Sequence, residues 1–433
     1  MRPPLFAFAL AAALATLPAC APLPKPPQPV DQRPVAMADP GSALQPGWQH
    51  GAFMVIDVRN WRDSNGDGIG DLRGLTQSLD ALADLGIKGL RLMPITRRED
   101  AGPGQAVSRQ RSIEPAYGTL ADFDQLLDEA HRRGIGVIMD YTMTPGAAAP
   151  PAVLAYHQDS LRFWLNRGLD GFHVGVLTQR LENDATPLNE PPESPALMRD
   201  VQQLISSYRQ RYLVCEATPS TSAWALGCES TLALDLSQPL LDAARGRPEA
   251  IARVAEYLKA APTTTTTTTM LPKHDALAGR RPGDEARSDA AAYRLAAATT
   301  LLLPGTPFID AGNALGMPGK MAAAQPDPQP LPAFYKPLLA LRNTLGPIAR
   351  GSSLSPQVEG LVFAFQRQLA DDRVLVLINY GREAATLRVA GLPAGATLSN
   401  EYPAGGALSR TDERGAIHLA LAPQSWRVLR LQR

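Results

Sequence analysis

The sequence predicts a (β/α)₈ barrel followed by a smaller all-β domain. Between residues 52 and 350, short apolar runs alternate with amphipathic helical patterns, which indicates βα units and a parallel sheet. Eight apolar or β-branched runs occur in this region, and eight parallel strands with intervening helices close into a barrel. After Gly351 the helical patterns end, and short β-like runs are separated by Gly, Pro and Asp. A chain of 433 residues is long enough for both domains.

The eight predicted barrel strands are short and rich in apolar or β-branched residues. They cover residues 52–58, 89–94, 136–141, 171–175, 212–216, 231–236, 263–269 and 306–310. The third is almost continuously apolar, as expected for a strand that is buried on both faces. The seventh is a run of seven threonines. Homopolymers are often disordered, but β-branched residues favour strands and a seventh strand is due here, so we predict a strand.

The helices predicted between these strands have apolar residues at helical spacing. For example, Leu75, Leu79, Leu82 and Leu85 fall on one face of the first helix. The predicted helices cover residues 72–85, 120–133, 151–168, 195–211, 240–260, 290–303 and 331–345. The tail domain contains predicted strands at 361–366, 374–379, 385–389, 417–421 and 427–431, which we expect to be antiparallel and packed on the barrel.

The first residues have the pattern of an export signal. Arg2 is the only early charge, and residues 5–17 are almost purely apolar but too few to span a bilayer. The run ends in Leu17-Pro18-Ala19-Cys20, which resembles a bacterial lipobox, in which Cys20 carries lipid after cleavage. An ordinary secretory peptide with a chance cysteine is the alternative. We expect a lipoprotein signal peptide at 1–20, a Pro-rich linker at 21–47, the barrel at 48–350 and a C-terminal β-sandwich domain at 351–433.

Bulk composition narrows the possible partners and compartment. Lys plus Arg and Asp plus Glu are both 42, so no basic excess suggests nucleic acid. By resemblance to Gram-negative lipoproteins, Ala21 after the cysteine favours the outer membrane, facing the periplasm or the cell surface. Cys215 and Cys228 would then meet an oxidising compartment, where a disulfide between them is possible.

One short loop has the composition of a hard-cation site. Oxygen-bearing side chains alternate with glycines in the stretch Asp63-Ser64-Asn65-Gly66-Asp67-Gly68-Ile69-Gly70-Asp71. The twelfth position is Gly74 rather than Glu, so the loop is not an EF-hand. A polar turn without an ion is the alternative, but clustered carboxylates repel one another unless a cation lies between them. We therefore expect Ca²⁺ here.

This loop and several later segments resemble the alpha-amylase superfamily, in particular its oligo-1,6-glucosidase and trehalose synthase branch. That resemblance implies calcium ligands at Asp63, Asn65, Asp67, Asp71 and the carbonyl of Ile69. It extends from about residue 50 to the C-terminus and implies a (β/α)₈ barrel that acts on α-glucosides. The matching segments are residues 71–74, 85–88, 118–123, 134–140, 163–172 and 304–309.

The positions that carry catalysis in this family are altered here. The family's nucleophile motif, Gly-Phe-Arg-x-Asp, is similar to residues 171–175, with His173 in the arginine position and Gly175 in the nucleophile position. The resemblance implies an acid/base role for Glu216. Lys273-His274-Asp275 keeps part of an Asn-His-Asp motif, which implies a transition-state-stabilising role for Asp275 and sugar binding by His274. Asp140 occupies a sugar-binding position, although the Asn-His pair that follows it in the family is absent.

Three functions are compatible with these changes. Because a retaining glycosidase needs two carboxylates, the loss at Gly175 favours a catalytically impaired family member that binds an α-linked glucosaccharide or acts as an envelope scaffold. An active glycoside hydrolase or glycosyltransferase is the alternative, in which Glu216 works with a displaced carboxylate at Asp170, Asp235 or Asp275. The third is a purely partner-binding lipoprotein, since fold alone does not determine function.

Overall fold

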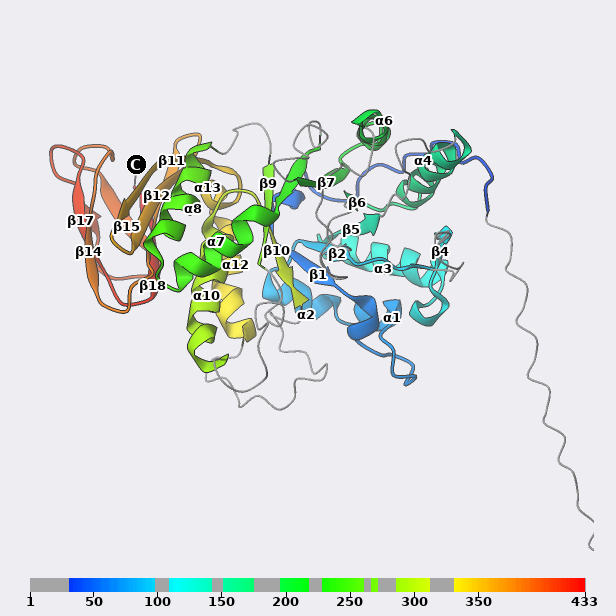
Figure 1. Ribbon diagram of the computed structural model, residues 1–433, viewed down its shortest axis with the longest axis horizontal. Coiled ribbons are helices and arrows are strands. Elements are labelled where there is room, and N and C mark those ends of the chain that lie inside the picture. The colour runs from blue at the N-terminus through cyan, green and yellow to red at the C-terminus, as the bar shows by residue number, and fades with distance from the viewer. Residues whose placement is uncertain are drawn as a thin grey trace, which may run out of the picture. The chain divides into compact units, whose positions relative to one another are not determined.

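The computed structural model of the chain describes residues 31–97, 109–141, 151–174, 195–217, 228–260, 266–271, 286–311 and 331–432 (Figure 1). The barrel and the C-terminal domain both lie in one unit that begins at Arg33.

Eight parallel strands close into a barrel, which confirms the predicted fold. Neighbours around the barrel follow the order β1-β2-β5-β6-β7-β8-β9-β10, and β10 pairs with β1 to close it. The strands are β1 Phe53–Ile56, β2 Gly89–Leu92, β5 Gly136–Tyr141, β6 Gly171–Val174, β7 Tyr212–Ala217, β8 Ser230–Ala233, β9 Thr266–Met270 and β10 Thr306–Asp310. A two-stranded hairpin that the sequence did not predict, β3 Thr96–Arg97 with β4 Arg109–Ile113, follows β2.

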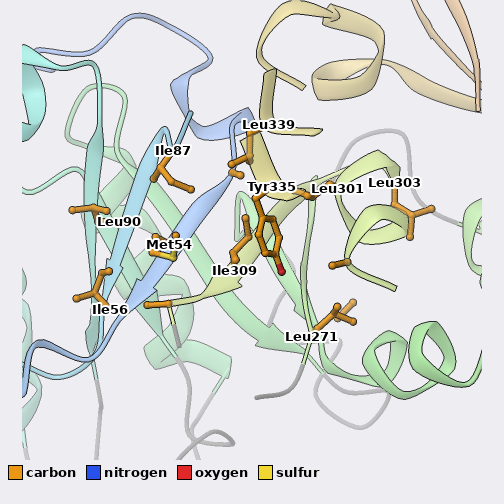
Figure 2. Packing of buried hydrophobic residues seen from close by; sticks show 14 of the residues in the cluster. Met54, Ile56, Ile87, Leu90, Leu271, Leu301, Leu303, Ile309, Tyr335 and Leu339 are labelled. Atoms are coloured by element: carbon orange, nitrogen blue, oxygen red, sulfur yellow. The ribbon is translucent and has the colours of Figure 1, made fainter. Parts of the chain in front are cut away.

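The helices largely occupy the predicted ranges. They are α1 Leu72–Thr76, α2 Leu79–Leu85, α3 Leu120–Arg132, α4 Pro151–Leu165, α6 Pro195–Ser206, α7 Leu234–Ala244, α8 Pro248–Ala260, α10 Ala286–Leu302, α12 Leu331–Thr344 and α13 Gly346–Arg350. Outward-facing residues of β1 and β10, such as Met54 and Ile309, pack in one buried cluster with Tyr335 and Leu339 of α12 (Figure 2).

Two helices predicted as continuous are divided, and the predicted strands at 52–58, 89–94 and 231–236 are shorter. The 72–85 range is split between α1 and α2, where the Ser78 hydroxyl donates to the Gly74 carbonyl and competes with the helical ladder. The 240–260 range is divided by Gly246, in a left-handed conformation, and by Pro248, which begins α8. The predicted strand at 231–236 ends at Ala233, because α7 begins there.

The N-terminal end of the barrel is filled by aromatic rings and hydroxyl groups. Phe53 and Trp48 lie 5.4 Å apart between ring centroids, and Tyr212 completes the layer. A Cβ at Gly136 would overlap the Trp48 ring, which explains a glycine at the first position of β5. The Thr268 hydroxyl lies 2.7 Å from that of Ser230. The polar threonine run is therefore compatible with a buried strand.

The C-terminal domain is all-β and antiparallel, as predicted. One sheet has the order β11-β12-β13-β18-β15-β16, and β14 pairs with β17 in a second sheet. The strands are β11 Ser352–Glu359, β12 Val362–Leu369, β13 Asp372–Asn379, β14 Ala385–Val389, β15 Thr397–Tyr402, β16 Ser409–Arg410, β17 Ile417–Leu421 and β18 Ser425–Leu431. Buried Arg367 of β12 donates to the Leu302 carbonyl at the end of α10, which joins this domain to the barrel.

Candidate functional site

The C-terminal ends of the barrel strands bring several of the predicted site residues to one face. β5 ends with Asp140 and Tyr141, and Asp140 is in register with His173 of β6. His173 is in turn in register with Val214 of β7. Glu216 lies two residues further along β7, towards the same end of the barrel. This face is where barrel enzymes hold their substrates.

Alternation along β5 directs Asp140 into the barrel. Val137 and Met139 pack in the outer hydrophobic cluster, whereas Ile138 belongs to the inner one. Residues two apart on a strand share a face, so Asp140 lies on the inner side with Ile138. The strand itself forms because its apolar residues can be buried on both faces.

Inside the barrel, Asp140 is bound by two basic side chains. Arg91 of β2 donates from Nε to Oδ1 at 2.6 Å and from Nη2 to Oδ2 at 2.9 Å, which is a bidentate ion pair. His173 Nδ1 lies 3.1 Å from Oδ1. The Arg91 guanidinium also lies 5.5 Å from the centre of the Phe308 ring. Both carboxylate oxygens are therefore occupied by groups of the protein.

The electrostatics of this cluster keep Asp140 ionised. Burial alone raises the pKa of the Asp140 carboxyl, but the nearby charges of Arg91 and His173, together with their hydrogen bonds, lower it to about 2. A carboxylate that is ionised and held on both oxygens cannot donate a proton at neutral pH. It is also a weaker nucleophile than a free carboxylate, because attack would require breaking these bonds.

Sequence reasoning missed Arg91, although its strand contained a signal. An arginine interrupts the apolar run from Leu90 to Leu92, and its side chain is only 3% exposed. A charged residue in a barrel strand is rarely buried without a partner. That partner, Asp140, lies 49 positions later in the chain, and only the pairing of β2 with β5 brings the two together.

Other predicted site residues lie partly or wholly outside the described region. These are Cys20, Gly175, His274 and Asp275, together with the side chain of Glu216. The described part of β6 ends at Val174, directly before Gly175.

Asp170, one candidate for a displaced carboxylate, lies at the opposite end of the barrel. It immediately precedes β6 and is fully buried. Its Oδ2 accepts hydrogen bonds from the Val137 backbone at 2.8 Å and lies 2.7 Å from His131 Nε2. Asp170 therefore cannot reach a substrate at the C-terminal face.

Asp235, a second candidate, is exposed in the first turn of α7, just after β8.

The acidic loop 63–71 is organised by backbone hydrogen bonds. Asp63 accepts from the amides of Asn65, Gly66 and Gly68, and these bonds lower the pKa of its carboxyl. Asp67 Oδ1 accepts from the Ile69 amide at 2.8 Å.

Asp71 has a different environment from the other loop acids. It is nearly buried, and it accepts from the Gly74 amide as the N-cap of α1 and from Ser64. The oxygen donors of the loop suit a hard cation. The described residues nevertheless contain no group of three or more His, Cys, Asp or Glu side chains arranged to hold a metal.

Cys215 and Cys228 form a disulfide with their Cα atoms 6.1 Å apart. Cys215 is the residue before Glu216 on β7, and Cys228 lies two residues before β8. Both cysteines are buried. The bridge thus ties the end of β7 that carries Glu216 to the beginning of the next strand.

Parts of the chain are similar in sequence to known proteins. Residues 56–144 match the family model described as alpha amylase, catalytic domain. The chain is 29% identical over 238 residues to a trehalose synthase/amylase of Mycolicibacterium smegmatis, covering 39% of this chain and 40% of that protein. It is 36% identical over 104 residues to a probable oligo-1,6-glucosidase of Bacillus subtilis, covering 24% of this chain and 18% of that protein. The resemblance to the alpha-amylase family is confirmed.

Solved structures of the family share the architecture. An alpha-amylase from Geobacillus thermoleovorans, complexed with acarbose, superposes with a TM-score of 0.71 at 18% identity, covering 89% of this chain and 99% of that one. An alpha-amylase from H. orenii gives a TM-score of 0.66 at 21% identity, covering 89% and 100%. At these identities the likeness concerns the fold. The matched stretches of the curated relatives span between 15% and 41% of their own length.

The alpha-amylase resemblance also bears on the two basic side chains that bind Asp140. It implies an arginine at position 173, whose charge keeps a carboxylate ionised. In this chain position 173 is a histidine, and a guanidinium reaches Asp140 from Arg91 on β2 instead. The positive charge is thus present in the barrel but is supplied by a different strand and neutralised by Asp140.

Proposed function

We propose that the protein is an envelope lipoprotein of the alpha-amylase family that binds α-linked glucosaccharides at the C-terminal face of its barrel and hydrolyses them weakly or not at all. The observation that carries this proposal is that the Asp140 carboxylate is bound by other side chains of the protein. This largely buried carboxylate, which lies in register with His173 of β6, is held on both oxygens by Arg91 and His173.

Retaining glycoside hydrolysis needs two carboxylates about 5 Å apart, one of which forms a covalent bond to the sugar. Gly175 has no side chain to form that bond. Asp140 is bound by Arg91 and His173 and is a poor substitute for the nucleophile. Glu216 could still protonate a leaving oxygen, but loss of a nucleophile typically lowers turnover by about 10⁴ to 10⁶-fold.

The alternative is an active enzyme with a displaced carboxylate. The placement of Asp170 at the other end of the barrel speaks against that residue. Asp235 and Asp275 remain as candidates for this alternative. An inverting pair would need one of them about 6.5–9.5 Å from Glu216, with room for a water molecule.

Two measurements test the proposal on the full chain. We expect maltotriose to raise the Tm, because a ligand that binds only the folded state stabilises it. We also expect hydrolysis of a nitrophenyl α-glucoside at background rates, and a gain in the double variant Gly175→Asp, His173→Arg, which restores the family motif. Asp170→Asn serves as a control that leaves the C-terminal face unchanged. Wild-type hydrolysis that is abolished by Glu216→Gln would show that the enzyme is active.

The same proposal places the protein at the outer membrane, attached through lipid on Cys20. The buried disulfide supports export, because disulfides persist in oxidising compartments. Among the described residues, no helix combines the length and apolar character needed to cross a bilayer. Intact mass measurement of the processed protein tests the anchor, with Cys20→Ser as the unlipidated control.

Ca²⁺ is part of the proposal as a structural ion of the loop 63–71. Asp63, Asn65, Asp67, Asp71 and the Ile69 carbonyl would hold it, and its charge would offset the repulsion between the carboxylates. We expect a chelator to lower the Tm of the wild type and to leave an Asp67→Ala variant unchanged. A wild-type Tm that does not respond to chelator or to added Ca²⁺ rejects this part of the proposal.

A further inference from the structure

Residues 33–48 form a segment, here called the clasp, that is bound along the barrel before β1 begins. Its main chain passes α4, then the turn before β7, and ends with Leu44 and Trp48 buried in the inner hydrophobic cluster (Figure 1, dark blue). The side chains of the first part are mostly exposed, from Arg33 to Ala38. The barrel therefore holds this part through its backbone.

Three side chains of the barrel bind the clasp backbone at two places and in the same way. Arg111 donates to the Arg33 carbonyl at 2.6 Å, and Asp159 accepts from the Val35 amide at 3.1 Å. Three residues later, Asn166 donates to the Ala36 carbonyl and accepts from the Ala38 amide, both at 2.9 Å. Each contact thus uses one carbonyl and the amide two residues further along.

The three-residue spacing of these contacts equals the repeat of a polyproline II helix. Pro34 lies between the first carbonyl and amide, and the preceding stretch from Pro22 is rich in proline. A proline-rich chain is thus suited to these contacts, because its preferred conformation matches their spacing and little entropy is lost on binding.

The clasp is fixed again beyond Ala38. Asp39 accepts from the backbone amide of Arg209 at 3.1 Å, and Arg211 donates to the Gly41 carbonyl at 2.8 Å. Arg211 is buried, so this contact is shielded from solvent. Leu44 and Trp48 then close the N-terminal end of the barrel.

We infer that the clasp shortens the tether between the membrane anchor and the barrel. This inference rests on the proposed lipid at Cys20. If the tether ran from Cys20 to Trp48, its 28 residue steps would span at most about 95 Å. With the clasp bound, only the 13 steps from Cys20 to Arg33 remain, which span at most about 45 Å. The clasp thus restricts the barrel to the zone next to the membrane and shields residues 35–38 from proteases.

Hydrogen exchange on the soluble Cys20→Ser chain tests the clasp independently of lipidation. We expect the Val35 and Ala38 amides to exchange at least about tenfold more slowly than in the double variant Asp39→Ala, Asn166→Ala, which removes contacts of the clasp. Asn343→Ala is the matched control, because Asn343 also donates to a backbone carbonyl, that of Gly86, away from the clasp. Wild-type amides that exchange at the rate of an unstructured peptide would overturn the inference.

Elastase treatment of the lipidated protein on vesicles tests whether the bound clasp protects residues 35–38 from proteolysis. Elastase cleaves after small residues. We expect cleavage after Val35, Ala36 or Ala38 in the double variant, which releases the barrel, and intact bonds at these positions in the wild type and in Asn343→Ala. Cleavage of the wild type at these bonds contradicts the inference. Absence of lipid on Cys20 would reject the anchor and the limit on reach, whereas the exchange result decides separately whether the clasp is bound.

Discussion

Arg91 and Asp140 lie on neighbouring barrel strands and form a bidentate ion pair inside the barrel, with Nε–Oδ1 and Nη2–Oδ2 distances of 2.6 and 2.9 Å. The side chain of Arg91 is 3% exposed and that of Asp140 is 12% exposed. The pair therefore lies in a region where removing either partner leaves an uncompensated charge. This ion pair occupies the one carboxylate that the described part of β5 places at the C-terminal face.

We expect Arg91→Met to lower the free energy of unfolding by about 3–5 kcal/mol, because it leaves the largely buried carboxylate of Asp140 with His173 as its remaining side-chain partner among the described residues. Urea unfolding measures this loss. The double variant Arg91→Met, Asp140→Asn should lose less than the sum of the single variants. Lys336→Met, which breaks an exposed ion pair with Asp84, is the control and should cost under about 1 kcal/mol. Strict additivity of the two barrel substitutions would argue against the pair.

Asp140 should also make the protein sensitive to strong acid. Its folded pKa of about 2 lies below its ordinary value of 3.8, so its contribution to stability is fully present above about pH 5 and is lost as the pH falls towards 2. The expected loss is about 2–3 kcal/mol. Urea unfolding between pH 5 and pH 2 measures it. Asp140→Asn should flatten this part of the profile, and an unchanged slope in that variant would contradict the assignment.

His157 should act in a higher pH window. Burial lowers the pKa of this histidine to about 4, and its Nδ1 lies 2.8 Å from the Tyr141 hydroxyl. The folded state thus prefers the neutral ring, so its contribution to stability is present above about pH 6.5 and declines as the pH falls towards 4. We expect a loss of about 3 kcal/mol across this window. Unfolding of His157→Asn, which cannot be protonated, should show no such loss, whereas Asp140→Asn should keep it.

The strands that could be predicted from the sequence are those whose apolar residues are bounded by turn residues. β5, β10, β14 and β17 have the predicted bounds, because each has apolar or β-branched residues at consecutive or alternating positions between clear breaks. β11, β15 and β16 were missed. Ser352–Glu359, for example, has few apolar residues and is recognised as a strand only through its pairing with β12.

The candidate site was predictable only in part. Motif resemblance could identify the positions of Asp140, His173 and Glu216, because each lies near the C-terminal end of a recognisable strand. It could not predict that Arg91 would bind Asp140, since that contact depends on the register of β2 with β5. Pro-rich composition indicated a linker at 21–47, because the main-chain contacts of Val35 with Asp159 and of Ala38 with Asn166 leave no pattern in the side chains of the segment.

The disulfide between Cys215 and Cys228 should contribute to stability. The bond closes a short loop, separated by 13 positions, and a loop of this size is worth about 3 kcal/mol in the chain-entropy description. We expect the double variant Cys215→Ser, Cys228→Ser to lose about that amount in urea unfolding, and reduction of the wild type to have the same effect. Reductant should leave the variant unchanged. A wild type whose unfolding is insensitive to reductant under conditions that reduce the bond would reject this contribution.

In the aromatic layer at the N-terminal end of the barrel, the Trp48 ring should require glycine at position 136. A methyl group on Gly136 would overlap the Trp48 ring, so Gly136→Ala should cost about 1–3 kcal/mol through overpacking. Trp48→Ala alone should cost about 3–5 kcal/mol, because a buried ring is lost and a cavity remains. In the double variant the new methyl group enters the space that the ring has left, so Gly136→Ala should cost much less there than in the wild type. Urea unfolding of the four proteins measures this coupling. If Gly136→Ala costs the same in both backgrounds, Trp48 is not the residue that requires glycine at the start of β5.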